Sequence, residues 1–394
     1  MSGGPTGALP DPVASALALA PEARRLAAEA ERDRRLPPGL LTAFARAGLF
    51  RLCVPRTLGG LEAEPRVLAE TVELVARADG SAGWCLMIGA TSGLVSAWLP
   101  AGAAHEVYGQ DPDVITGGVF APGGRAVPVD GGYRVTGRWP YASGCEHCRW
   151  LMGGTLVQDA GESRPGPGGT PDVRLMLFPS ADVLVHDTWW AAGLRATGSH
   201  DIEVRERFVP AERSLSLISE RPRHPGALYA FPPFGLLALG IAAVALGIAR
   251  AAIDELGELA VTKTPTLARQ ALAARSGVQA DRARAEALVR AARAFLDDAV
   301  GAAWDAVRAG GAAEVPTRLR AELRLAATHA VRSAAQAVDL VYDAGGGTAV
   351  YEASPLQRHF RDVHTATQHM MVGVPTLELA GRVLLGLPAD TTML

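Results

Sequence analysis

The sequence predicts a mixed α+β protein in which a β-rich segment separates two helical ones. Helical periodicity covers residues 21–104, short apolar runs broken by Gly, Pro and Asp occupy 113–209, and helical periodicity returns after 232. Strands do not alternate with helices, so a parallel βαβ sheet is not expected. We predict an N-terminal helical domain (1–108), a central β domain (109–217) and a C-terminal helical bundle (218–394).

The N-terminal segment is predicted to contain four helices. The stretch "PEARRLAAEAERDRRLPPGLLTAFARAGLF" contains an amphipathic repeat, a proline break and a second repeat. The stretch "EPRVLAETVELVARADGSAGWCLMIGATSGLVSAWL" contains two more repeats, which separate at Asp79-Gly80. A turn-forming pair at that point predicts the end of one helix and the start of the next.

The middle segment is predicted to form strands. Its apolar runs are short and lie between turn residues; they include "GYRVTGRW", "WLMGGTLV", "VRLMLFP" and "HDIEVRERFVP". Runs of this length, bounded by Gly, Pro and Asp, are typical of a sheet.

The C-terminal segment is predicted to be a bundle because its Ala/Leu/Arg-rich repeats are too long to be stable without packing. The run from Phe234 to Ala249, "FGLLALGIAAVALGIA", carries no charge. It is shorter than the roughly 20 residues of a membrane span and continues into charged residues with helical periodicity. We expect a buried bundle helix there and no membrane partner.

The composition is that of an ordinary globular protein, with 394 residues, 48% hydrophobic, 20% charged and a formal net charge of -3. No basic patch indicates nucleic acid. Four cysteines do not form a disulfide framework, and "MSGGPTGALPDP" lacks the features of a secretory signal. We therefore expect a cytoplasmic protein.

The stretch "SGCEHC" (143–148) contains two cysteines that could belong to a metal site or a redox pair. A structural zinc needs four ligands, and Cys53 and Cys85 lie far upstream without a matching spacing. A redox pair would be expected in a βαβ setting. We expect Cys145 and Cys148 to be packing residues and predict no metal site.

Four segments in this order resemble the acyl-CoA dehydrogenase fold, and most closely its branch of flavin-dependent two-component monooxygenases and hydroxylases. They are "GLFRLCVPRTLGG" (48–60), "GGYRVTGRWPYASGCEHCRW" (131–150), "GLRATGSHDIEVRERFVP" (193–210) and "YDAGGGTAVYEASPLQRHFRDVHTATQHMMV" (342–372). The resemblance extends over nearly the whole chain, and it implies that the central β domain is similar to a barrel and that the C-terminal domain is a four-helix bundle.

In the second segment the resemblance implies one wall of a flavin site, formed by Trp139, Tyr141, Ser143 and Gly144. Tyr141 stands where the dehydrogenases have a Trp, and Ser143 where they have a Thr whose hydroxyl lies near flavin N5. A hydroxyl there can steer protonation of N5. From the residues alone, a Ser before a Gly is more often a turn residue.

The last segment favours oxygen chemistry over desaturation. By the dehydrogenase spacing the catalytic base falls at about Met370, and no carboxylate lies between Asp362 and Glu378. A thioether cannot act as a general base. The resemblance implies that the adjacent His369 faces the reactive side of the flavin, whereas a histidine bonded to a carbonyl at the edge of the core is the alternative.

The remaining predicted site residues also depend on the resemblance. For the cofactor they are Ser199, His200, Arg269, Gly346 and Gly347, with Arg269 and the glycines acting across a subunit interface. Substrate-pocket candidates are Trp84, Ser92 and Met370, and Ser92 stands where phenol hydroxylases of the branch have a histidine. The alternatives are that Arg269 is a solvated arginine on a helix, that the glycines form a turn that ends a helix, and that Trp84 is a core residue.

The predicted function is a flavin-dependent monooxygenase that receives reduced flavin, FMN in preference to FAD, from a separate reductase. With O2 it would form a C4a-hydroperoxide and oxygenate a small organic substrate, such as an aromatic compound or secondary metabolite. No nicotinamide-binding G-x-G-x-x-G opens a helix after a strand. The alternatives are an FAD-dependent acyl-CoA desaturase with Glu352 or Glu378 as base, and a non-catalytic flavin-binding scaffold. The resemblance also implies a homotetramer.

Overall fold

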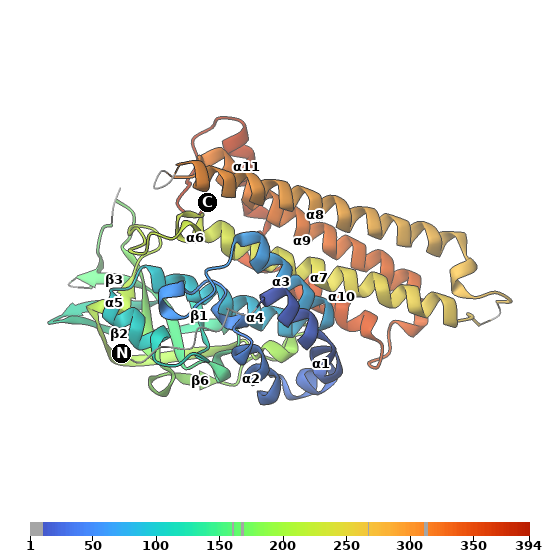
Figure 1. Ribbon diagram of the computed structural model, residues 1–394, viewed down its shortest axis with the longest axis horizontal. Coiled ribbons are helices and arrows are strands. Elements are labelled where there is room, and N and C mark those ends of the chain that lie inside the picture. The colour runs from blue at the N-terminus through green and yellow to red at the C-terminus, as the bar shows by residue number, and fades with distance from the viewer. Residues whose placement is uncertain (1–10, 160, 167–168, 267, 311–313) are drawn as a thin grey trace.

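The computed structural model describes residues 11–394 apart from 160, 167–168, 267 and 311–313, and it contains two helical parts and a sheet in the predicted order (Figure 1). The N-terminal helices are α1 (Pro12–Asp33), α2 (Pro38–Arg46), α3 (Pro65–Ala78), α4 (Gly80–Ser92) and α5 (Ala101–Ala104). The predicted break at Asp79 is confirmed: this residue ends α3, and its carboxylate accepts the Ala82 N–H at 2.7 Å to cap α4.

The sheet contains the strands β1 (Thr116–Val129), β2 (Gly132–Ala142), β3 (Trp150–Asp159), β4 (Glu162–Ser163), β5 (Val173–Pro179), β6 (Leu184–His186), β7 (His200–Pro210) and β8 (Ser214–Leu215). Their order is β6-β7-β2-β1-β3-β5-β8, and β4 pairs with β3. Neighbouring strands are antiparallel except for β1 and β3, which are parallel. Two register shifts interrupt the β1–β3 ladder, which bends the sheet there.

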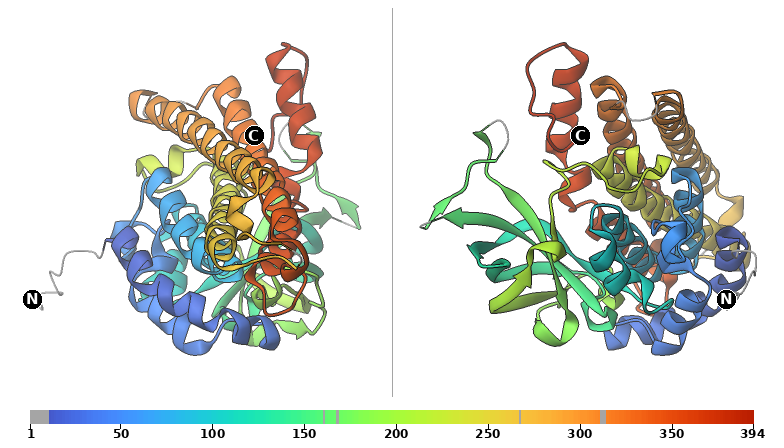
Figure 2. Two further views of the ribbon diagram at one scale, coloured as in Figure 1. Left: turned by 90° about the vertical axis from the view of Figure 1, so that its right-hand side faces the viewer. Right: turned by 60° about the vertical axis from the view of Figure 1, so that its left-hand side comes forward.

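The C-terminal part contains α6 (Ala227–Ala230), α7 (Pro233–Thr262), α8 (Ser276–Gly310), α9 (Thr317–Gly345), α10 (Pro355–Ala366) and α11 (Val374–Leu384). The long helices α7, α8 and α9 lie side by side, with α10 against α7 and α9 (Figures 1 and 2). The predicted α+β order, a helical part, a sheet and a helical bundle, is therefore confirmed.

Helix α7 forms the centre of this bundle. It is long and apolar enough to cross a membrane by length and composition, but 89% of its apolar window is buried inside the protein. The 16 uncharged residues noted in the sequence are only its first half, because charged residues continue the helix to Thr262. The buried bundle helix predicted here is therefore present.

Helix α4 connects the three parts of the fold. It packs against α7 of the bundle, β1 of the sheet and the turn Arg195–Thr197 that precedes β7. Almost every residue of α4 is buried. A side chain on α4 can therefore contact the sheet and the bundle at the same time, which fixes where the site is assembled.

Candidate active site

The end of β2 contains a strained residue with an exposed aromatic ring. Tyr141 has φ +66°, and the pairing of β2 with β7 shifts register between Trp139 and Ala142. Positive φ is unfavourable for a bulky residue and often marks a functional site. The Tyr141 side chain is 70% exposed, and its ring meets that of Trp189 edge-on at 6.3 Å. This ring is therefore available to stack on a planar ligand.

The structure corrects the prediction that Trp139 lines the flavin site. Trp139 is completely buried inside the sheet domain, where its indole N–H donates to the Gly154 carbonyl at 2.6 Å. A Cβ added at Gly124 or Gly153 would lie 2.5 Å from the indole, so these glycines provide the space for the ring. The register shift after Trp139 directs Tyr141 outward, although residues two apart on a strand normally share a face.

Ser143 belongs to a chain of hydrogen bonds that connects α4 with the segment before β7. The Trp84 indole N–H donates to Ser143 Oγ at 3.0 Å. Ser143 Oγ lies 2.7 Å from Ser199 Oγ, which lies 2.6 Å from Thr197 Oγ1. Thr197 Oγ1 donates to the Leu194 carbonyl at 2.7 Å. Ser143 and Ser199 are both almost fully buried.

The direction of this chain follows from its carbonyl end. A carbonyl only accepts, so the single hydroxyl hydrogen of Thr197 is used there, and Ser199 must donate to Thr197. Ser143 must then donate to Ser199. With the Trp84 N–H occupying one acceptor site, Ser143 Oγ retains one further lone pair. Ser143 is therefore prepared to accept a hydrogen bond from a ligand.

The same chain is attached to α10 through a buried carboxyl group. The Leu194 N–H donates to Asp362 Oδ1 at 2.6 Å, and Asp362 is 3% exposed. Burial, and then the nearby carboxylate of Asp79, raises the pKa of Asp362 to about 7. Arg361, next to it, donates to Glu31 of α1 at 2.5 Å. These contacts fix the turn that carries Thr197 and Ser199.

His369 lies beside Trp84 in the short turn between α10 and α11. The two rings meet edge-on, with 5.8 Å between their centroids. His369 Nδ1 accepts the Met371 N–H at 3.2 Å, which places the hydrogen of the neutral imidazole on Nε2. Burial, and then the charge of Arg324, lowers the pKa of His369 to about 4. The imidazole is therefore neutral at pH 7 and can donate a hydrogen bond from Nε2.

The three substrate-pocket candidates lie in different surroundings. Trp84 is 6% exposed and has its N–H bonded to Ser143, so it offers only its ring. Ser92 is buried on α4, roughly 12 Å along the helix from Trp84, and its carbonyl accepts the Tyr108 hydroxyl. Met370 is 60% exposed next to His369. The structure thus brings Trp84 and Met370, but not Ser92, to the His369 turn.

Gly144 and His200 have structural partners at the positions where a cofactor contact was expected. The Gly144 N–H donates to the Thr197 carbonyl at 2.8 Å, and its φ of +70° is one that favours glycine. His200 Nδ1 accepts the backbone N–H groups of Thr188 and Trp189, each at 3.2 Å. His200 therefore orders the turn that holds Trp189 against Tyr141.

The C-terminal ends of α7 and α9 lie at the other end of the bundle, on the right in Figure 1, and Arg269, Gly346 and Gly347 follow these helix ends in the chain. All three are exposed or partly exposed, and Lys263 Nζ donates to the Gly345 carbonyl at 2.8 Å. Arg324, whose side chain reaches the His369 turn, is 21 residues before Gly345 on α9, which is roughly 30 Å. Within one chain these residues cannot contact a ligand held by Ser143 and His369.

The bases required by the desaturase alternative are not at this site. Glu352 and Glu378 are both exposed, Glu352 in the turn before α10 and Glu378 on α11. The position next to the Trp84 ring is occupied by His369.

Cys145 and Cys148 are buried free thiols. Their sulfurs face the carbonyls of Gly198 and Gly144, and burial raises the pKa of Cys145 to about 12. A thiol in this state is a poor nucleophile and metal ligand. Across the residues that the structure describes, no group of three or more His, Cys, Asp or Glu is arranged to hold a metal.

The sequence interpretation missed Thr197, Leu194, Asp362 and Arg195. Arg195 lies in the turn that carries Thr197, and its buried Nε has no hydrogen-bond partner among the described residues. Three of the four belong to "GLRATGSHDIEVRERFVP", so the signal was in a segment already singled out. Hydrogen bonds that only the fold brings about give Thr197, Leu194 and Asp362 their role, whereas Arg195 is distinguished by its buried Nε.

The arrangement fits a reduced flavin. Tyr141 offers an exposed ring to its face, Ser143 Oγ has a lone pair for the hydrogen on N5, and a neutral His369 lies nearby. Arg195 adds a cation in the same turn. These residues would hold the cofactor between the sheet and the bundle.

Known proteins share both the sequence and the fold. The family model described as acyl-CoA dehydrogenase, N-terminal domain, matches residues 16–106, and the one described as acyl-CoA dehydrogenase, C-terminal domain, matches residues 239–373. Indole-3-acetate monooxygenase of Pseudomonas putida is 36% identical over 365 residues, or 91% of this chain and 89% of the relative.

Two further similarities concern the reductase and the cofactor. The flavin-dependent monooxygenase, oxygenase subunit HsaA, of Rhodococcus jostii is 32% identical over 89% of this chain and 92% of its own. The structure of XiaF from Streptomyces sp. in complex with FADH2 and glycerol superposes with a TM-score of 0.88 at 30% identity, over 96% of this chain and 95% of that one. The oxygenase-subunit name implies a separate reductase and a small-molecule substrate. This chain belongs to the acyl-CoA dehydrogenase family, in its branch of flavin-dependent monooxygenases, and is an oxidoreductase that uses reduced flavin.

Proposed function

We propose that the protein oxygenates a small aromatic substrate with O2 at the cluster of Trp84, Ser143 and His369. The observation that supports this most is the unused lone pair of Ser143 Oγ, at the end of a directed hydrogen-bond chain beside a neutral histidine. Reduced flavin, when bound, supplies the two electrons that activate O2. The chain's own residues then have three tasks: to orient the ring, to hold protons and to exclude water.

Ser143 orients the flavin ring and holds its N5 hydrogen. Because its own hydrogen is donated to Ser199, Ser143 Oγ can only accept from the cofactor. An acceptor at N5 retains the hydrogen there, which delays the loss of oxygen as peroxide. The Trp84 N–H fixes the oxygen in this role.

His369 is the proton donor on the other side of the cluster. Its Nδ1 is bonded to the Met371 N–H, so Nε2 carries the hydrogen that can bind or protonate an oxygen atom. The Trp84 ring packs against the imidazole and is itself 6% exposed. This packing limits the access of water, which would otherwise favour release of peroxide.

The proposed flavin is FAD, although the sequence resemblance favoured FMN. The support is the FADH2 bound by a structural neighbour of 30% identity. Parallel anaerobic titrations of the protein with reduced FAD and reduced FMN measure the preference. If FMN bound at least as tightly as FAD, the preference for FMN expected from the sequence would stand instead.

We propose a homotetramer in which Gly346, Gly347 and Arg269 of one subunit complete the flavin site of another. The support is their position at the end of the bundle, roughly 30 Å along α9 from the turn that carries His369. Sedimentation with and without flavin tests this assembly. An Arg269→Glu variant that assembles normally should bind the flavin more weakly, and unchanged binding would contradict a role for Arg269.

We also propose that the protein works in the cytoplasm without membrane or nucleic-acid partners. The support is the burial of α7, the four free thiols and a net charge of -3. Cell fractionation tests this proposal, and recovery with membranes or nucleic acid would contradict it.

The test of the proposed reaction is an assay with supplied reductant. Reduced FAD from an unrelated reductase, O2 and indole-3-acetate, the substrate in the name of one relative, are mixed with the protein. We expect O2 uptake and a product that contains one additional oxygen atom. O2 uptake that yields only peroxide with indole-3-acetate and a panel of phenols and indoles would contradict an aromatic substrate.

A further inference from the structure

Two arginines of α9 lie on one face of the helix, and neither has a carboxylate partner among the residues that the structure describes. Arg320 and Arg324 are four residues apart, a spacing that places two side chains next to each other. The Nε atom of each is buried and lacks a hydrogen-bond partner in the described part of the chain. Two positive charges at this spacing repel each other, so the pair destabilises the helix unless an anion neutralises it.

The neighbouring Arg318 shows the usual arrangement. Its side chain is 74% exposed and pairs with Glu322 of the same helix at 2.8 Å. Among the residues described, neither Arg320 nor Arg324 has such a pair. None of the residues outside the description is acidic, so the chain holds no further side-chain carboxylate for them.

Arg324 is the more deeply buried of the two. It is 4% exposed and donates to two carbonyls, that of Met371 at 2.9 Å and that of Met393. Burial lowers the pKa of Arg324 to about 10. The guanidinium remains charged at neutral pH, and the positive charge of this face is therefore fixed.

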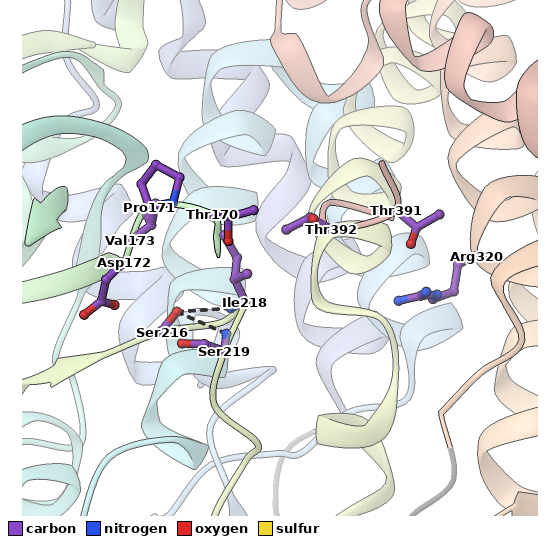
Figure 3. Close-up of a pocket in the computed structure, with 10 residues that line it drawn as sticks. All are labelled: Thr170, Pro171, Asp172, Val173, Ser216, Ile218, Ser219, Arg320, Thr391 and Thr392. Carbon is purple, nitrogen blue, oxygen red and sulfur yellow. Dashed lines mark hydrogen bonds between the residues drawn. The ribbon is translucent and has the colours of Figure 1, made fainter. Parts of the chain in front are cut away.

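Arg320 lines a pocket of about 380 Å³ between the sheet domain and the bundle (Figure 3). The other lining residues belong to three segments, 170–173, 216–219 and Thr391-Thr392. In Figure 3 the guanidinium of Arg320 extends toward the space between these segments, whereas Asp172 lies on the opposite side. Asp172 is 3.9 Å from Arg164, which offsets its charge. The volume is that of a site for a small molecule.

The side chain of Arg324 connects the surroundings of this pocket with the turn that carries His369. Arg324 is one helical turn beyond Arg320, and its partner Met371 is two residues from His369. The other carbonyl bound by Arg324 is that of Met393, which is next in the chain to Thr392, a residue that lines the pocket. Arg320 and Arg324 are about 6 Å apart along α9, and the side chain of Arg324 spans the remaining distance to the His369 turn.

We infer that Arg320, supported by the charge of Arg324, binds a carboxylate of the substrate, so that the enzyme acts on aromatic carboxylic acids. This inference depends on the proposed function, because it places the aromatic ring at His369. The carboxylate would replace the missing counter-ion and receive a charge-assisted hydrogen bond from Arg320. The hydroxyl of Thr391 lies beside it as a further donor, whereas the hydroxyl of Thr392 already donates to Asp390 at 2.5 Å.

The test compares acids with their uncharged amides. Calorimetric titrations of the enzyme with bound FAD use benzoate, phenylacetate and indole-3-acetate, each beside its primary amide. We expect at least one acid to bind about tenfold or more tightly than its amide, since a charge-assisted bond has this strength. Arg320→Gln should reduce that preference to about threefold or less, and Arg320→Lys should retain part of it.

Arg318→Gln is the matched control, because this exposed arginine lies two residues away and should leave the preference unchanged. The inference is overturned if no acid is preferred over its amide, or if Arg320→Gln and Arg318→Gln have the same effect. Formation of an oxygenated product by the wild-type enzyme with reduced FAD and O2 separates the two claims. Product without a preference for acids contradicts only the inference, whereas O2 uptake that yields only peroxide contradicts the proposed function.

Discussion

The Trp84 indole N–H donates to Ser143 Oγ at 3.0 Å, although the two residues are 59 positions apart and belong to different parts of the fold. Trp84 is on α4, and Ser143 follows the last residue of β2. The same indole packs edge-on against His369, which follows α10 of the bundle. Trp84 therefore fixes the distance between Ser143 and His369, which would act on the two sides of the reacting centre.

Replacing Trp84 by Phe tests this relationship. The ring that packs against His369 remains, but Ser143 Oγ loses the donor that fixes its orientation. We expect a loss of about 1 kcal/mol in the free energy of unfolding and a larger share of peroxide relative to oxygenated product. Urea denaturation and the peroxide-to-product ratio measure the two effects.

Trp98→Phe is the matched control. Trp98 is buried, and its N–H donates to the Glu220 carbonyl at 3.0 Å, outside the cluster. The Trp98→Phe variant should lose similar stability, but its peroxide share should not change. If both variants raised the peroxide share equally, the effect of Trp84→Phe would come from lost stability and not from the lost bond to Ser143.

Tyr141→Ala should weaken flavin binding, whereas Trp139→Phe should lower the stability of the fold. Tyr141 is 70% exposed, so its removal should weaken flavin binding about tenfold while stability changes little. Trp139→Phe removes the buried bond to Gly154 and leaves a gap, which should cost about 1 to 3 kcal/mol of stability. Flavin binding per folded molecule should then be unchanged. If Trp139→Phe weakened flavin binding more than Tyr141→Ala did, the proposed flavin site would be contradicted.

The pKa of His369 predicts how activity depends on pH. A histidine with a usual pKa of 6.5 would gain its proton near that pH, but burial lowers the pKa of His369 to about 4. The neutral form is therefore retained as the pH falls, and kcat/KM should stay level from pH 7 to 5 and decline only toward pH 4. His369→Gln should lower kcat by a factor of about 100 or more and remove this dependence.

The pH profile requires a correction for acid unfolding. Burial also lowers the pKa of His147 to about 4 and of His359 to about 3. Their neutral forms stabilise the fold above pH 6.5, and this contribution is lost as the pH falls toward their folded pKa values. Circular dichroism at each pH gives the folded fraction. A decline of activity centred near pH 6.5 in fully folded protein would contradict a neutral His369.

Asp362 predicts the opposite dependence of stability on pH. Burial raises its pKa from the usual 3.8 to about 7, so the fold favours the protonated form. The stabilisation is complete below pH 3.8 and is lost as the pH rises through 7. Asp362→Asn keeps an acceptor for the Leu194 N–H but does not ionise. The variant should therefore gain stability relative to the wild type as the pH rises from 5 to 8.

Urea denaturation at pH 5, 6.5 and 8 measures this difference for Asp362→Asn. The exposed Asp113→Asn serves as the control and should show a constant difference from the wild type. If Asp362→Asn also differs from the wild type by a constant amount, Asp362 is ionised throughout this range.

The order of helices and strands could be predicted because periodicity is a local property of the sequence. The break at Asp79-Gly80 and the buried α7 both follow from residues close together in the chain. The opposite directions of Trp139 and Tyr141 could not be predicted, because they depend on a register shift against β7. The same applies to the Ser143–Ser199–Thr197 chain, whose direction depends on a carbonyl that only the fold brings into contact.

The family resemblance located Ser143 and His369 but not the reasons for their roles. The acceptor state of Ser143 follows from the hydroxyls of Ser199 and Thr197, and the neutral state of His369 from its burial. Arg320 and Arg324 of α9 lie outside the four segments that carry the resemblance, and the sequence alone does not single them out, because an arginine in a helical repeat is ordinarily solvated. Only the burial of Arg320 Nε and Arg324 Nε distinguishes them.

The most direct test of the central claim is the delay between O2 uptake and peroxide release when the enzyme with bound reduced FAD is mixed with oxygen in the absence of substrate. If Ser143 retains the N5 hydrogen of the flavin, the wild-type enzyme should take up O2 first and release peroxide later, and Ser143→Ala should shorten this delay about tenfold or more. Simultaneous uptake and release in the wild type, or an equal delay in Ser143→Ala, would contradict the account.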